Sequence, residues 1–370
     1  MAVPACPRLW LNQGVDAVFY NWSSCDKTQK LCSESAEEPG NRPKCVPDRL
    51  INARYAFASA GRGKIERRNM TTSRMLARSQ TILKSWQTWN WASAFSVFIY
   101  PILGLAMLIT MVVLGLALEG LTLHWWYAPL AIFSMALTIF LCNMGIGPLH
   151  RIWQHRAGEI KAPAQVIVML NCILAMQGSL KDWVNYHSQH HRFADQPGDP
   201  HNPFESKFWA WVGWILWRDE KDTARPMPMW LKENPVVAFG DRYHITLSLV
   251  MHLIVPAVIY GIVALAGGSL ILTAILHASV VIGRAIQFHA TTLGVNVFGH
   301  MKTPLWFDYV LALLTGGEAL HDHHHDFPRS ALHLPKKGIW NRIVDYNGTF
   351  LLVLRRLGLA KNLEIAPQFA

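Results

Sequence analysis

Two copies of the pattern His-x-x-His-His are the part of this chain best suited to chemistry. The six residues are His187, His190, His191, His321, His324 and His325. On an α-helix, positions i, i+3 and i+4 lie on one face, so each copy is expected to direct three imidazoles at one point. Imidazole is the commonest metal ligand in proteins, and the pattern therefore predicts a transition-metal centre.

Two shorter patterns add to this centre. His150 and His155 stand five residues apart, well off one face of an ideal helix, so this pair is expected to serve two metals or to straddle a helix end. Asn296 and His300 lie one helical turn apart. The nine histidines of the four patterns exceed the roughly four to six ligands of one first-row ion, and two metals are predicted.

The elements that must position these residues are apolar. Hydrophobic residues make up 51% of the 370-residue chain and charged residues 16%. Four long apolar runs cover 91–118, 125–144, 245–266 and 270–288. Because about 20 apolar residues cross a bilayer, the fold class predicted is an all-α integral membrane protein with four transmembrane helices in two hairpins. A soluble protein with buried core helices is the disfavoured alternative, since such long runs are rare there.

The distribution of positive charge predicts the orientation. All but one of the 34 Lys and Arg residues lie outside the four runs and their two short turns, and the exception is Arg284. Positive residues stay on the cytoplasmic side, so both termini and the histidine clusters are expected there, in a helical cap. The formal charge of +10 suits anionic membrane lipids and an acidic soluble partner; no nucleic-acid partner is expected.

The first 69 residues differ in character from the rest. They are polar and show no sustained period, so a poorly ordered extension is expected, followed by a single domain over 70–370. Met70 and Met75 precede the first amphipathic sequence, so a misplaced start and a functional extension both remain open. The six cysteines have irregular spacing and predict neither a disulfide set nor a zinc site.

These motifs together resemble the membrane fatty acid desaturases, the acyl-CoA and acyl-lipid family that includes the stearoyl-CoA Δ9 enzymes. The family's first box matches 150–156, its second box with the preceding Asp-Trp-Val matches 182–191, and its third box matches 317–328. The Asp-Pro-His and Asn-x-x-x-His elements match 199–201 and 296–300. The resemblance covers about residues 85 to 360. Asp322 and Asp326 depart from the usual third box but leave the histidines intact.

The resemblance implies the cofactors and the reaction. Two non-haem Fe²⁺ ions would be held by the nine histidines, with Asn296 holding an iron-bound water and molecular oxygen as co-substrate. Asp182, Asp199 and Glu318 are candidates to orient the imidazole rings. The activity implied is formation of a cis, Δ9-like double bond in a long acyl chain carried on CoA or lipid. The sequence shows no haem-binding or ferredoxin-like motif, so a separate cytochrome b5-type or ferredoxin donor, with its reductase, is expected.

Two other functions compete with desaturation. The same histidine cage could hydroxylate a lipid, because the two outcomes diverge only after the first hydrogen abstraction. A metal-transporting membrane protein is a remote alternative. It would place its ligands within the spans along a path for the ion, whereas the histidine clusters lie outside them. The location expected is the bacterial inner membrane or the endoplasmic reticulum.

Overall fold

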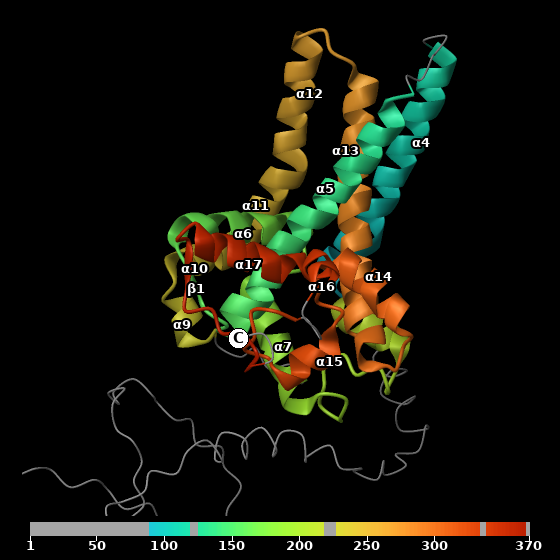
Figure 1. The fold of residues 1–370 in the computed structure, drawn as a ribbon. Helices are drawn as coiled ribbons and strands as arrows, with labels where there is room; N and C mark the ends of the chain where they lie inside the picture. The colour runs from blue at the N-terminus through green and yellow to red at the C-terminus, as the bar shows by residue number, and fades with distance from the viewer. Residues whose placement is uncertain (1–88, 119–124, 218–226, 334–337, 368–370) are drawn as a thin grey trace, which may run out of the picture. The chain divides into compact units, whose positions relative to one another are not determined.

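The structure is a computed structural model, and it describes residues 89–118, 125–217, 227–333 and 338–367 (Figure 1). The extension predicted over 1–69 and the question of the start lie outside the described residues. Within these ranges the chain is almost entirely helical, and its one sheet pairs two-residue strands, β1 (Glu159–Ile160) and β2 (Ala360–Lys361), in antiparallel fashion. The prediction of an all-α protein is confirmed.

Four helical segments in the described part of the chain are long and apolar enough to cross a membrane, as predicted. They cover Trp91–Leu114, Tyr127–Gln154, His244–Leu265 and Leu270–His300. The first contains α3 (Trp91–Ala94) and most of α4 (Tyr100–Leu118), the second α5 (Tyr127–Pro148), the third α11 (His244–Leu249) and α12 (Val255–Leu265), and the fourth α13 (Leu270–His289). π-Helical turns occur at Phe95–Ile99, Leu149–Gln154, Val250–Ile254 and Ala290–Val295.

The remaining helices carry or support the histidines. They are α6 (Ala162–Ala175), α7 (Leu180–Phe193), a π-turn at Trp209–Gly213 with α8 (Trp214–Leu216), α9 (Met229–Lys232), α10 (Pro235–Arg242), a 3₁₀ turn at Phe298–His300, α14 (Leu305–Thr315), α15 (His321–Asp326), α16 (Ile339–Val344) and α17 (Tyr346–Arg356). The axes of α6 and α7 differ by 83°. Together, but not separately, these two helices are long and apolar enough to cross a membrane.

The long helices show the surface expected of segments in lipid. Large apolar side chains such as Ile102 (62% exposed), Ile132 (66%) and Leu265 (92%) point away from the protein. Exposure of so many apolar groups would be unfavourable in water, and the bilayer is the solvent that accepts them. Within the bundle, α13 packs against both α4 and α5.

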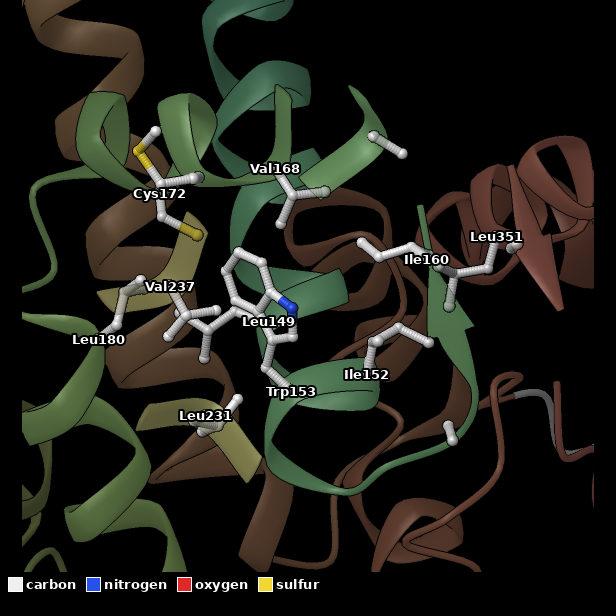
Figure 2. Packing of buried hydrophobic residues seen from close by; sticks show 14 of the residues in the cluster. Leu149, Ile152, Trp153, Ile160, Val168, Cys172, Leu180, Leu231, Val237 and Leu351 are labelled. Atoms are coloured by element: carbon white, nitrogen blue, oxygen red, sulfur yellow. The ribbon is translucent and has the colours of Figure 1, made fainter. Parts of the chain in front are cut away.

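Close backbone contacts bring the end of α5 to the helices around it. A side chain at Gly145 would meet backbone atoms of Asn171 and Cys172 in α6, so only glycine permits this approach. Farther along, Leu149, Ile152 and Trp153 pack into an apolar cluster with Val168 and other residues of α6, α10 and α17 (Figure 2). The turn that carries His150 and His155 is therefore held by packing on its apolar side.

Candidate metal centre

Nine histidines gather into two groups, and they are the same nine that the sequence patterns predicted. The first group is His150, His155, His187, His191 and His324, and the second is His190, His300, His321 and His325. In each group, one ring nitrogen per residue lies within 4.8 Å of those of the others. The neighbouring groups offer five and four nitrogen ligands, which is suited to two ions.

The expectation that each His-x-x-His-His copy directs its three rings at one point is wrong. In α7, His187 and His191 join the first group, while His190 joins the second. A residue turns about 100° per position in a helix, so i+4 lies about 40° from i on one side and i+3 about 60° on the other. Helix α7 therefore runs between the two groups and supplies both.

Helix α15 divides its histidines in the opposite sense. His321 and His325 belong to the second group, and their Nε2 atoms lie 3.0 Å apart. His324 belongs to the first group, 2.9 Å from Nε2 of His191 and 3.1 Å from Nε2 of His150. Helix α7 thus supplies two histidines to the first group and one to the second, and α15 supplies one to the first and two to the second.

His150 and His155 serve one group, because the turn between them is not α-helical. The N–H of His155 donates to the carbonyl of His150 at 3.1 Å, which is the i to i+5 bond of a π-helix. This wider turn places residues five apart on one face, and the two ring centroids lie 4.9 Å apart. The expectation that this pair lies at a helix end is met, since His155 caps the π-helix. The alternative, that the two histidines belong to different groups, is not.

Three carboxylates hold the outer nitrogens of these rings. Nδ1 of His150 lies 2.6 Å from Glu318 Oε2, Nδ1 of His190 lies 3.0 Å from both oxygens of Asp199, and Nδ1 of His300 lies 2.9 Å from Asp195. A carboxylate on Nδ1 makes this atom the donor and leaves the lone pair of Nε2 for a metal.

The other predicted carboxylate, Asp182, lies elsewhere. It is exposed at the start of α7, where its backbone N–H donates to the Ser179 hydroxyl. Among the described contacts, none joins the Asp182 carboxylate to a histidine.

Asn296 also stands outside both groups. Its side-chain amide donates to the Ala210 carbonyl at 3.4 Å.

The buried environment keeps the rings neutral. Burial is the largest cause that lowers the pKa of His187, His321 and His324 well below its ordinary value, and neighbouring imidazoles lower it further. Burial acts to raise the pKa of Glu318, but the charge of Arg151 and the His150 contact bring it below its usual value. Neutral imidazoles beside an ionised carboxylate are the form that binds a metal cation.

The donor geometry fits first-row metal ions. Within the groups, pairs of Nε2 atoms lie as little as 2.9 to 3.3 Å apart, as for His155 with His187 and His190 with His325. Two imidazoles bound about 2.1 Å from one ion at a right angle would lie about 3.0 Å apart. Nε2 of His300 is buried without a hydrogen-bond partner, as a nitrogen reserved for a metal would be.

A buried polar network behind the first group was not predicted. Arg151 is fully buried; its guanidinium lies 2.8 Å from Glu318 and 2.7 Å from Asp345, and donates to the Ala331 carbonyl. Asn347 also donates to Glu318 at 2.9 Å. This network ties the first box to the third box through Glu318, and to the N-terminal end of α17.

Sequence reasoning also missed His333. Its ring is fully buried, 4.7 Å from that of His324 and 5.5 Å from that of His150. Its Nδ1 lies 3.4 Å from the Glu318 carboxylate. The only signal in the sequence was one histidine between two leucines, outside any repeated pattern.

A cavity of about 920 Å³ opens beside the centre. Its lining includes His187, His190 and His321 at one part, and apolar residues of the first, third and fourth spans at another. Asp182 and Asn296 also border it. Apolar walls that lead to a group of metal ligands can admit a long hydrocarbon chain.

Comparisons with known proteins show what this chain is similar to. No family model matches the chain. It is 28% identical to a probable acyl-CoA desaturase of Schizosaccharomyces pombe over 303 residues, which cover 78% of this chain and 57% of that protein. It is 28% identical to an acyl-CoA Delta-9 desaturase of Acheta domesticus, over 68% of this chain and 72% of that one. A sn-1 stearoyl-lipid 9-desaturase of Synechocystis is 27% identical, over 64% and 73%.

The fold and the site together define a membrane protein with a histidine-rich centre that could hold metal. The comparisons add that the chain is related to the acyl-CoA desaturases, which are oxidoreductases that act on fatty acyl substrates. The relatives are named for Delta-9, Delta-11 and Delta-12 activities, so the likeness extends over enzymes of differing bond position.

Proposed function

We propose that this protein introduces a cis double bond into a long-chain fatty acyl group at a diiron centre, with a Δ9-like bond position. The observation that carries the proposal is the division of nine buried or partly buried imidazoles into neighbouring groups of five and four beside a largely apolar cavity. The nine histidines would hold two iron ions. Asn296 would hold a water near the second group; it lines the same cavity as His190 and His321.

The residues of this chain would divide the work as follows. Iron with molecular oxygen supplies the oxidising power that removal of hydrogen from an unactivated methylene demands, which no side-chain acid or base provides. Glu318, Asp199 and Asp195 hold the rings in the tautomer that presents Nε2. The apolar wall of the cavity holds the acyl chain and excludes water from the reacting methylenes.

The reaction also requires electrons from outside the spans. We propose a separate donor of the cytochrome b5 or ferredoxin type, with its reductase, that docks on the cytoplasmic side where the basic residues and the histidines lie. The formal charge of +10 favours an acidic donor. Activity that does not change with ionic strength would contradict this part of the proposal.

The test is the fatty acid profile, by gas chromatography and mass spectrometry, of a desaturase-deficient host that expresses the chain with a donor. We expect a new cis-monoene that is lost in His190→Ala and retained in the matched control His323→Ala. His323 neighbours the third-box ligands on α15 but belongs to neither group. Hydroxylated chains in place of the monoene would assign the centre to a hydroxylase. Metal flux in vesicles without a lipid product would favour the transporter.

A further inference from the structure

The cavity ends, on its membrane side, in a small set of polar side chains that the metal centre does not use. Ser96 and Tyr100 of the first span and His252 of the third all line it, and each is at most 9% exposed. His252 lies eight residues into its span, a depth of about 12 Å. A polar group at such depth is costly in an apolar surround unless it has a partner.

Two of these side chains donate their hydroxyl protons to backbone carbonyls. The Ser96 hydroxyl donates to the Met176 carbonyl at 3.3 Å, and the Tyr100 hydroxyl donates to the His252 carbonyl at 3.4 Å. These two hydroxyls can offer only lone pairs to the cavity.

The ring of His252 makes the requirement specific. Its Nε2 is buried and has no hydrogen-bond partner. In the neutral ring this nitrogen is either a donor or an acceptor, and a group in the cavity must match it. A hydroxyl both donates and accepts, so it can pair with either form, whereas a plain methylene can pair with neither.

The positive charge of Arg284 limits which groups can pair with His252. The guanidinium of Arg284 is fully buried, donates to the Ser96 hydroxyl at 3.2 Å and lies 5.7 Å from the Tyr100 ring centroid. A cationic amine would be repelled there. Ser248 lies one helical turn before His252 and also lines the cavity, so its hydroxyl can return a hydrogen bond. A neutral hydroxyl, which both donates and accepts, matches this pair.

We propose that this end of the cavity binds a hydroxyl group on the substrate, so that hydroxylated long-chain acyl groups bind better than plain ones. The proposal rests on the proposed function, because it takes the cavity to be the acyl site. It adds a determinant of substrate class, His252, that acts at a distance from the reacting methylenes. This residue binds the chain and belongs to neither group of metal ligands.

The test is competition binding on the purified full chain in detergent, with radiolabelled stearate as probe. Unlabelled stearate and a positional series of monohydroxystearates compete with it. We expect at least one positional isomer to bind about tenfold tighter than stearate, the gain of one net hydrogen bond to a buried nitrogen. His252→Leu should abolish this preference, and Gly261→Ala, in the same span but outside the cavity lining, should keep both the preference and stearate binding.

Other outcomes overturn the inference or its foundation. If no isomer binds more tightly than stearate, a water satisfies Nε2 and the proposal is wrong. If the preference survives in His252→Leu, another group recognises the hydroxyl. His252→Asn, which retains an acceptor, should restore part of the preference, and this separates recognition from a general loss of packing. Desaturation of plain stearate without any hydroxyl preference would leave the proposed function standing, whereas the absence of all acyl binding would remove both.

Discussion

A carboxylate that accepts from Nδ1 of a histidine affects how strongly its Nε2 binds a metal, and Asp199 and Asp195 can be compared in this role. Asp199 holds Nδ1 of His190 and is buried, whereas the Asp195 side chain, on Nδ1 of His300, is 39% exposed. We expect Asp199→Asn to weaken iron binding by about 10- to 100-fold, because the ring loses its anionic partner. Iron retained per protein across a chelator series measures this. Asp195→Asn should cost less, and an equal loss would show that burial does not decide the effect.

Arg151 is the residue whose loss should most disturb the fold. It lies between the Glu318 and Asp345 carboxylates, and all three side chains are at most 5% exposed. Arg151→Met leaves two buried carboxylates without their cation, which destabilises by about 3 to 5 kcal/mol. Thermal unfolding in detergent should show the loss. In contrast, Arg329→Met breaks a pair whose side chains are 62% and 48% exposed and should cost no more than about 1 kcal/mol; similar losses would contradict the argument.

At the scale of helices, the sequence predicted which segments exist better than it predicted how they turn. Apolar length was enough to predict the four spans, because crossing lipid requires it. The π-turn that unites His150 and His155 has no comparable signal, since its hydrogen bonds depend on how the end of α5 packs. The division of α7 between two groups could not be seen either, because helical periodicity gives directions around an axis but not the positions of neighbouring groups.

The crossing of α5 and α6 holds the helix that carries His150. A Cβ at Gly145 would clash with the backbone of Asn171 and Cys172, so Gly145→Ala must push the helices apart. We expect about 1 to 3 kcal/mol of destabilisation and a reduced iron content, since His150 follows on the same helix. Gly261→Ala, in α12, meets no atom within 4 Å and should be neutral or slightly stabilising. Equal behaviour of the two variants in unfolding and iron assays would refute the close-contact argument.

Across the whole molecule, the buried histidines should make the metal-free protein sensitive to acid. The pKa values of His321 and His324 lie well below their ordinary value because of burial, and burial also lowers that of His325, to about 2. Below about pH 6.5 the unfolded chain binds protons that the folded chain does not, so stability falls as pH falls, by up to about 1.4 kcal/mol per unit for each such histidine. Above this pH the term vanishes.

This prediction is checked by the unfolding midpoint of chelator-treated protein from about pH 8 to about pH 5. His324→Gln should make the decline shallower by about one proton. A midpoint that is flat over this range would mean that the rings accept protons in the folded state.

The orientation in the membrane is a property of the entire chain. With one exception, Lys and Arg lie outside the four apolar runs and the two short turns that join them, as do the nine histidines, so both are expected on the cytoplasmic side. We expect a cysteine at Ala266, in the short turn between α12 and α13, to react with an impermeant maleimide from outside the cytoplasm, and one at Arg329 to react only after permeabilisation. Both positions are exposed, and the six native cysteines would be replaced first. The reverse labelling would place the histidines away from cytoplasmic electron donors, and the proposed donor would then have to be abandoned even if the chain desaturates lipids.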